Sequence, residues 1–182
     1  MYNTHTSVWI GNLGKYNDGK LVGEWITVPF TEEEFEKLLE RIGIGEEDAL
    51  GQEYEEWYVA DWDSLMPIHV TQYMGYNALM ELSELIERVE DMYESEVKAI
   101  AAYLDECSNN LEEAVDCIED GRYVHLPWIH SWEEYGEHIF DDCGYGSDVP
   151  ESMRDYIDFK KLGEDYGANG TISSEHGYFE TW

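Results

Sequence analysis

The feature that most constrains the fold of this chain is its negative charge. Its 182 residues include 42 Asp and Glu against 10 Lys and Arg, a formal net charge of −32. Thirteen acids against two bases lie in residues 31–63, fourteen against two in residues 81–120, and eleven against three in residues 133–166. Because 43% of the residues are apolar and 14% aromatic, the acids are interleaved with core-forming residues. This pattern predicts folded domains with acid-covered surfaces, and not a disordered acidic tail.

The charge also excludes several classes of function. A strongly negative surface repels phosphate groups, so we expect no direct binding to nucleic acid or to an anionic membrane, and the partner should be basic. No apolar stretch approaches the ~20 residues of a membrane span, and the first residues do not resemble a secretion signal. Three cysteines without CxxC spacing are typical of reduced thiols, so we expect a cytoplasmic protein.

The beginning of the chain predicts a small domain with both strands and a helix. Residues 7–10 and 21–28 are rich in Val, Ile, Leu and Trp, and the Asn-Asp-Gly of the intervening residues 15–20 favours a loop between two antiparallel strands. Residues 31–34 have the spacing of a capping box that starts a helix. A third strand is expected at residues 55–62.

The rest of the chain divides into a helical part and a second mixed part. Apolar residues recur at helical spacing through residues 71–120, with acids on the remaining surface. Residues 121–182 predict a strand, a helix that starts with a second capping box at residues 131–134, and a closing hairpin. We therefore expect an α+β fold made of three small domains in an elongated row, residues 1–70, 71–120 and 121–182.

Carboxylates on such helices can imitate a nucleic acid. Acids at positions i, i+3 and i+4 stand ~5–6 Å apart, and duplex DNA carries one charge per about 1.7 Å of its axis. An acidic protein of matching shape would enter the cationic groove of a DNA-binding enzyme. Composition alone makes DNA mimicry one candidate among others. The acids that we expect to contact such a partner are Glu55, Glu56, Asp61, Asp63, Glu84, Glu87, Asp91, Glu133, Glu134, Glu137, Asp141 and Asp142.

A dense apolar group in the last third is the candidate for self-association. Glutamates repel one another across a large interface, so a homodimer contact must use acid-poor stretches. The candidate contact residues are Trp128, Ile129, Trp132, Tyr135 and Phe140. The alternative for this group is packing in the core of its own domain.

The sequence predicts no catalytic residue, metal site or cofactor. His130 and His138 lie near several glutamates, but HExxH spacing is absent, as are P-loop, Rossmann and GxSxG motifs. Two other classes of function stay open at this point. One is a metal-dependent hydrolase that uses a carboxylate cluster, and the other is an acidic chaperone for basic proteins. Adaptation to high salt would also explain the acid-rich surface.

Several segments give the chain a resemblance to a known family. They are residues 13–25 (LGKYNDGKLVGEW), 53–63 (EYEEWYVADWD), 130–143 (HSWEEYGEHIFDDC), 149–159 (VPESMRDYIDF), 170–172 and 176–180. In their order and spacing these segments resemble the ArdA antirestriction proteins. The likeness covers both ends of the chain, whereas the middle helices match in type more than in sequence.

The resemblance implies a function and an assembly. ArdA proteins are carried by plasmids, conjugative transposons and phages, and are elongated three-domain homodimers that mimic bent B-form DNA. They occupy the DNA-binding groove of type I restriction–modification enzymes and inhibit restriction and often modification. The antirestriction motif of the family would fall within residues 132–143, near the dimer contact. This chain departs from the family by having Gly136 where Ala is expected.

Overall fold

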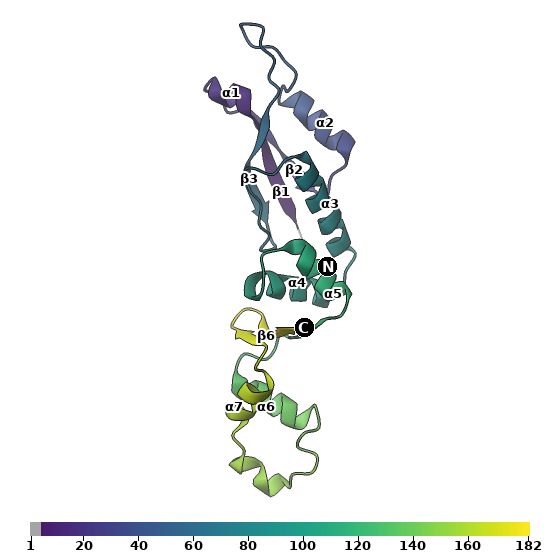
Figure 1. The fold of residues 1–182 in the computed structure, drawn as a ribbon, viewed down its shortest axis with the longest axis vertical. Helices are drawn as coiled ribbons and strands as arrows, with labels where there is room; N and C mark the ends of the chain where they lie inside the picture. Colours follow the sequence, from purple (N-terminus) through teal and green to yellow (C-terminus); the bar gives the residue numbers. More distant parts are fainter. Residues whose placement is uncertain (1–4) are drawn as a thin grey trace. The chain divides into compact units, whose positions relative to one another are not determined.

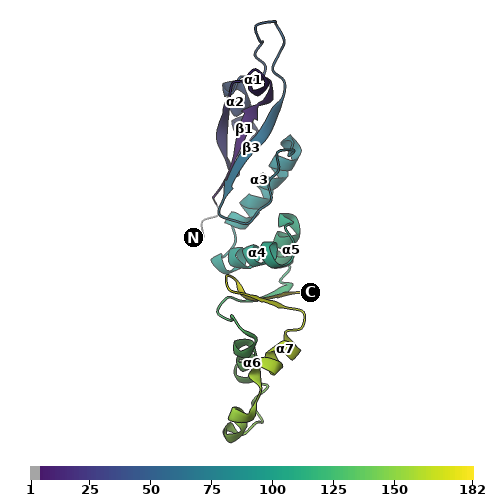
Figure 2. The ribbon, with the colours of Figure 1, turned by 90° about the vertical axis from the view of Figure 1, so that its left-hand side faces the viewer.

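The computed structural model describes residues 5–182 (Figures 1 and 2). The chain forms two compact units. Of the described residues, the first unit contains 5–94 with 109–112, and the second contains 95–108 with 113–182.

A three-stranded antiparallel sheet is the centre of the first unit. Its strands are β1 (Thr6–Asn12), β2 (Gly23–Val28) and β3 (Trp57–Ser64), in the order β2-β1-β3. Val8 pairs with Ile26 on one side and with Trp62 on the other. The predicted pair of antiparallel strands and the third strand are therefore confirmed.

Two helices cover one face of this sheet, α2 (Glu32–Arg41) and α3 (Tyr76–Glu90) (Figure 1). The capping box of α2 is confirmed, because Glu34 N–H donates to Thr31 Oγ1 and the Thr31 N–H donates to Glu34 Oε2. Buried Ser83 attaches α3 to the chain before α2, since its hydroxyl accepts from Phe30 N–H at 2.9 Å and donates to the Phe30 carbonyl oxygen at 3.2 Å.

The connection between β1 and β2 differs from the prediction. In place of a simple loop, it contains the short helix α1 (Leu13–Asn17). Buried Asn12 starts this helix, because its Oδ1 accepts from Lys15 N–H at 2.9 Å while its Nδ2 donates to the Ile42 and Gly43 carbonyl oxygens. The Asn-Asp-Gly segment forms the end of α1 instead of a hairpin turn.

The second unit combines helices with another small sheet. Its strands β4 (Tyr123–Leu126), β5 (Thr171–Ser173) and β6 (Gly177–Thr181) are antiparallel in the order β4-β6-β5, which confirms the predicted closing hairpin. The helices are α4 (Glu94–Glu106), α5 (Leu111–Glu119), α6 (Trp132–Asp141), the 3₁₀ helix η1 (Glu151–Tyr156) and α7 (Phe159–Tyr166). The start of α5 belongs to the first unit.

The core of the second unit is built around Tyr178, which is fully buried. Its ring stacks on the Tyr135 ring with centroids 4.0 Å apart, and Ile129 and Ile139 complete the cluster. Helix α6 packs against α7 where two glycines, Gly136 and Gly163, face each other closely. The mixed composition of helices and small sheets agrees with the predicted α+β class, while the division into three domains stays a prediction.

Candidate partner-binding surface

The twelve candidate acids are exposed on elements of both units. In the first unit, Glu84 and Glu87 lie on α3, and Asp91 caps its C-terminal end. In the second unit, Glu133, Glu134, Glu137 and Asp141 lie on α6, and Asp142 caps it. Exposed carboxylates remain hydrated until a partner arrives, so these groups are available for contact with a basic surface.

Strand β3 positions two of these acids on one face of the sheet. Asp61 pairs with Trp9 and Asp63 with Ser7 in β1. Side chains alternate between the faces of a strand, so Asp61 and Asp63 point away from the core residues Val8 and Ile10. This face of the sheet therefore combines carboxylates with the Trp9 side chain.

Four of the twelve acids accept hydrogen bonds within the chain. Asp61 Oδ1 accepts from the neighbouring Trp62 N–H at 2.9 Å. Glu134 Oε2 accepts from His130 N–H at 2.7 Å, while Glu134 N–H donates to Ser131 Oγ at 3.2 Å. The second predicted capping box is therefore formed in a modified way, because the Glu134 side chain accepts from the backbone N–H of His130 instead of that of Ser131. Asp142 Oδ2 lies 2.8 Å from His138 Nδ1. Among residues 5–182, only Asp141 and Asp142 of the twelve acids have an ion pair, and the other ten have none.

Asp141 forms the most complete of these contacts. Arg154 binds it with two hydrogen bonds, one of them 2.8 Å between Nη2 and Oδ2. The guanidinium also lies over the Phe159 ring at 4.9 Å and near the Phe140 ring at 5.6 Å. These hydrogen bonds, more than the charge attraction, lower the pKa of Asp141. Arg154 therefore connects η1 to α6, and it neutralises one of the predicted contact acids.

This ion pair predicts a pH dependence. The pKa of Asp141 is lower in the folded than in the unfolded chain, so its contribution to stability is present above ~pH 4, the usual value for Asp, and is lost as the pH falls through the lowered value. We expect the free energy of unfolding of the Arg154→Gln variant to lie below that of the wild type near neutral pH, with a smaller difference in acid. Urea titrations at several pH values measure this.

A matched control is Lys160→Gln, which removes the exposed Lys160–Glu164 pair of 3.8 Å. It should change stability little at any pH, because exposed pairs contribute little. A pKa of Asp141 that is the same in wild type and Arg154→Gln by carboxyl NMR would contradict the assignment.

The candidate dimer residues have unequal exposure. Ile129 and Tyr135 are buried in the core cluster of their own chain, and Trp132 is half-buried and packs against that cluster. Phe140 is half-buried against Phe159. Trp128 alone among the five is largely exposed, at 64%. For Ile129 and Tyr135 this burial favours the alternative of packing in the core of their own domain, and the dimer contact itself stays a prediction.

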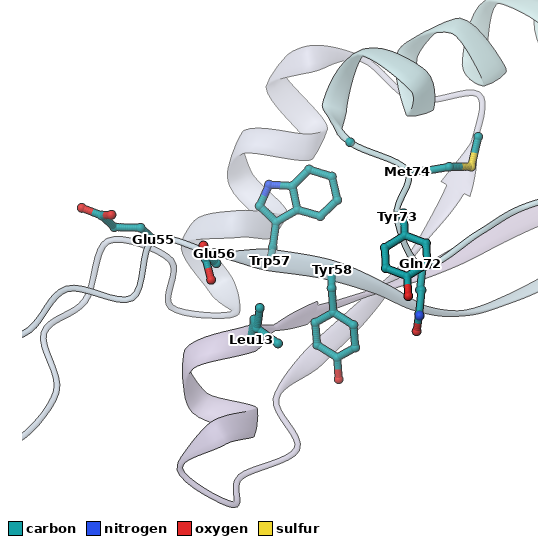
Figure 3. Close-up of a pocket in the computed structure, with 9 residues that line it drawn as sticks. Leu13, Glu55, Glu56, Trp57, Tyr58, Gln72, Tyr73 and Met74 are labelled. Carbon is teal, nitrogen blue, oxygen red and sulfur yellow. The ribbon is translucent and has the colours of Figure 1, made fainter.

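A pocket lies beside two of the predicted acids in the first unit (Figure 3). It has a volume of about 620 Å³ and is lined by the start of β3, Leu13 and residues 72–75. Glu55 and Glu56 lie at one end, and Gln72 and Tyr73 at the other (Figure 3). Sequence reasoning missed residues 72–75, because they follow a proline-interrupted segment without helical or strand periodicity.

A second hollow of about 390 Å³ lies next to this pocket and shares Glu55 and Glu56 with it. Asp18, Asp48 and Glu53 also line it. Tyr54, another lining residue, donates to Asp18 Oδ2 at 2.6 Å, and this hydrogen bond raises the pKa of Tyr54 to about 12. The hydrogen bond joins the 46–55 segment to the end of α1.

One group of side chains in the second unit has the donor atoms of a metal site. Asp105, Glu175 and His176 offer ligand atoms that lie within 4.8 Å of one another. His176 Nε2 lies 2.7 Å from Asp105 Oδ2, so the same atoms make an ion pair between α4 and the β5–β6 turn. Both carboxylates are exposed, in keeping with a surface contact. The expectation that no metal is used stays a prediction.

Fold and surface together define a small acidic α+β protein whose carboxylates are exposed on both of its units. The family model described as antirestriction protein (ArdA) matches residues 8–180, and the chain belongs to this family. Its members are antirestriction proteins. The resemblance stated from the sequence motifs is thus confirmed. A comparison with curated proteins found no match. Within residues 5–182, no helix is both long and apolar enough to cross a membrane.

Proposed function

We propose that this protein mimics DNA, occupies the DNA-binding groove of a type I restriction–modification enzyme, and inhibits restriction and modification. The observation that supports this most directly is the exposure of the twelve candidate carboxylates on both units, ten of them without an ion pair among residues 5–182. Membership of an antirestriction family supports a restriction enzyme as the target. The proposal needs no catalytic residue and no cofactor.

The size of the charge fits this function. A net charge of −32 equals the backbone charge of ~16 base pairs of duplex. An enzyme groove that binds DNA is lined by Lys and Arg, so an acidic chain of similar charge density is attracted into it and releases the same counterions. This gives a reason for a folded protein to bear so much self-repulsion.

The test is a competition between the protein and labelled duplex for a purified type I methyltransferase complex. We propose that the protein displaces the duplex, and that rising salt weakens both complexes. A ternary complex that keeps the duplex bound would exclude occupation of the groove. Equal affinity for unrelated basic proteins would support the acidic-chaperone alternative.

We also propose that the protein acts as a homodimer whose contact includes Trp128. This ring is 64% exposed beside Pro127, in an acid-poor stretch. We expect Trp128→Asp to shift the protein from dimer to monomer in light scattering, because an apolar anchor is replaced by a charge that repels the acidic partner chain.

Trp182→Asp is the control for this change, since its ring has nearly the same exposure, 66%, and lies outside the candidate contact. It should leave the mass unchanged. A Trp128→Asp protein that keeps the wild-type mass, whether monomer or dimer, would remove Trp128 from the interface.

A further inference from the structure

The pocket at the start of β3 combines aromatic rings with carboxylates. Trp57 and Tyr58 follow one another in β3, so their side chains point to opposite sides of the strand (Figure 3). Tyr73 completes the aromatic lining and is 86% exposed. Glu55 and Glu56 precede the strand, and none of the nine described residues that line the pocket is Lys or Arg.

These components define the chemistry of an occupant. The face of an aromatic ring attracts a cation, and two carboxylates add a negative field, so a positively charged group is favoured over a neutral or anionic one. A guanidinium is planar, stacks on rings and binds carboxylates with two hydrogen bonds, whereas an ammonium group acts as a compact, strongly hydrated charge. A nucleotide whose base stacked on these rings would bring a phosphate group that the glutamates repel.

The second unit of the same chain contains this combination with its cation in place. Arg154 lies near the rings of Phe140 and Phe159 and makes two hydrogen bonds to Asp141. In this arrangement one guanidinium contacts aromatic rings and a carboxylate at the same time. The pocket beside β3 offers similar groups toward solvent.

We propose that the pocket lined by Glu56, Tyr58 and Tyr73 binds an arginine side chain of the basic partner protein. This inference rests on the proposed function, because it assumes that the partner is basic. The adjoining acidic hollow, which shares Glu55 and Glu56, adds to the field that attracts the arginine. Within a surface that acts through its total charge, this pocket is a local contact with a defined shape.

A peptide titration tests the pocket without the enzyme. The probe is Ac-Gly-Arg-Gly-NH₂, with the citrulline peptide as a neutral analogue of equal shape and the lysine peptide as a control for charge. Trp57 lines the pocket, so its indole N–H signal reports on binding, and the other six Trp signals report on the rest of the surface. We expect the arginine peptide to shift the Trp57 indole and the amides of residues 72–75, with about threefold or more higher affinity than lysine and no binding by citrulline.

The titration can overturn the inference in three ways. The citrulline peptide could bind with the same affinity as the arginine peptide, or the lysine peptide could do so. The third outcome is that the arginine peptide shifts neither the Trp57 indole signal nor the amide signals of residues 72–75. In the Tyr73→Ala variant the arginine peptide should cause no such shifts. Because the Tyr73 side chain is highly exposed, its removal should not unfold the protein, so unfolding would not explain the loss. Persistence of the shifts in this variant would also contradict the pocket.

The same variant separates the pocket from the general charge of the surface. Tyr73→Ala removes no charge, so we expect its affinity for the type I complex to fall by about tenfold with an unchanged dependence on log salt. Tyr156→Ala is the control, since Tyr156 has a similar exposure of 82% and does not line the pocket. Equal affinities of the two variants would overturn the inference. A wild-type protein that fails to displace duplex contradicts the proposed function instead, while the peptide titration still decides what the pocket binds.

Discussion

Replacing nine of the candidate acids by their amides, all together, should lower the affinity for a type I enzyme by about three orders of magnitude. These nine have no ion pair, and the set leaves out Glu134 because it caps α6. Each exposed charge contributes ~0.2–1 kcal/mol, so nine sum to several kcal/mol. Single substitutions should cost less than about fivefold, because the remaining field persists. The grouped variant should also show a flatter dependence of affinity on log salt, since fewer counterions are released. The nine are Glu55, Glu56, Asp61, Asp63, Glu84, Glu87, Asp91, Glu133 and Glu137.

The measurement is a salt titration of affinity on single and grouped variants. The fold is checked by circular dichroism, and the grouped variant should be at least as stable as the wild type because like charges have been removed. If one acid-to-amide substitution alone abolishes inhibition while fold and dimer survive, the distributed mechanism is wrong.

The second large effect concerns a glycine that lies inside a helix. We expect Gly136→Ala to destabilise the second unit by about 3 kcal/mol, although alanine in a helix interior is normally favoured by ~1 kcal/mol. A Cβ on Gly136 would overlap the Phe159 carbonyl oxygen and lie 2.7 Å from its carbon. Gly163 has the reciprocal conflict with the Trp132 carbonyl. The two helices can approach this closely only because both positions lack a side chain.

Urea unfolding followed by tryptophan fluorescence measures this effect, since Trp132 lies beside the helix contact. Glu137→Ala is the control, because it introduces the same residue at an exposed position of the same helix. It should change stability by less than about 0.5 kcal/mol. A Gly136→Ala protein as stable as the wild type would show that α6 and α7 can move apart without a cost in the free energy of unfolding.

The family resemblance predicted Ala at position 136, and the structure explains why Gly fits here. The carbonyl of Phe159 occupies the space that a methyl group would need. This approach between two helices depends on segments more than twenty residues apart, so neither helix reveals it by itself. Sequence comparison identified the departure, and the tertiary contact supplies its reason.

Local signals predicted the elements well. The capping box at Thr31, the helical periodicity of α3 and the closing hairpin depend on residues a few positions apart, and each is confirmed. Helix α1 was missed because buried Asn12 receives its support from the carbonyls of Ile42 and Gly43, far along the chain.

The candidate site shows the same division. Exposure of the twelve acids was predictable, because charged side chains are rarely buried without a partner. The core positions of Ile129 and Tyr135 were not predictable. An apolar cluster has the same sequence pattern whether it packs against its own sheet or against a second chain. The ion pair between Asp141 and Arg154 also joins positions that have no regular spacing.

Strand β3 has a further consequence for the behaviour of the protein in solution. It lies at an edge of its sheet, where unpaired backbone groups are a template for strands of other molecules. The register shifts between Trp9 and Ile10 leave Ala60 as an extra residue, and such a bulge distorts the edge. Asp61 and Asp63 add charges on either side of Trp62. The carboxylates that we propose for partner binding should thus also protect the sheet against aggregation, and they would do so in a cell that contains no restriction enzyme.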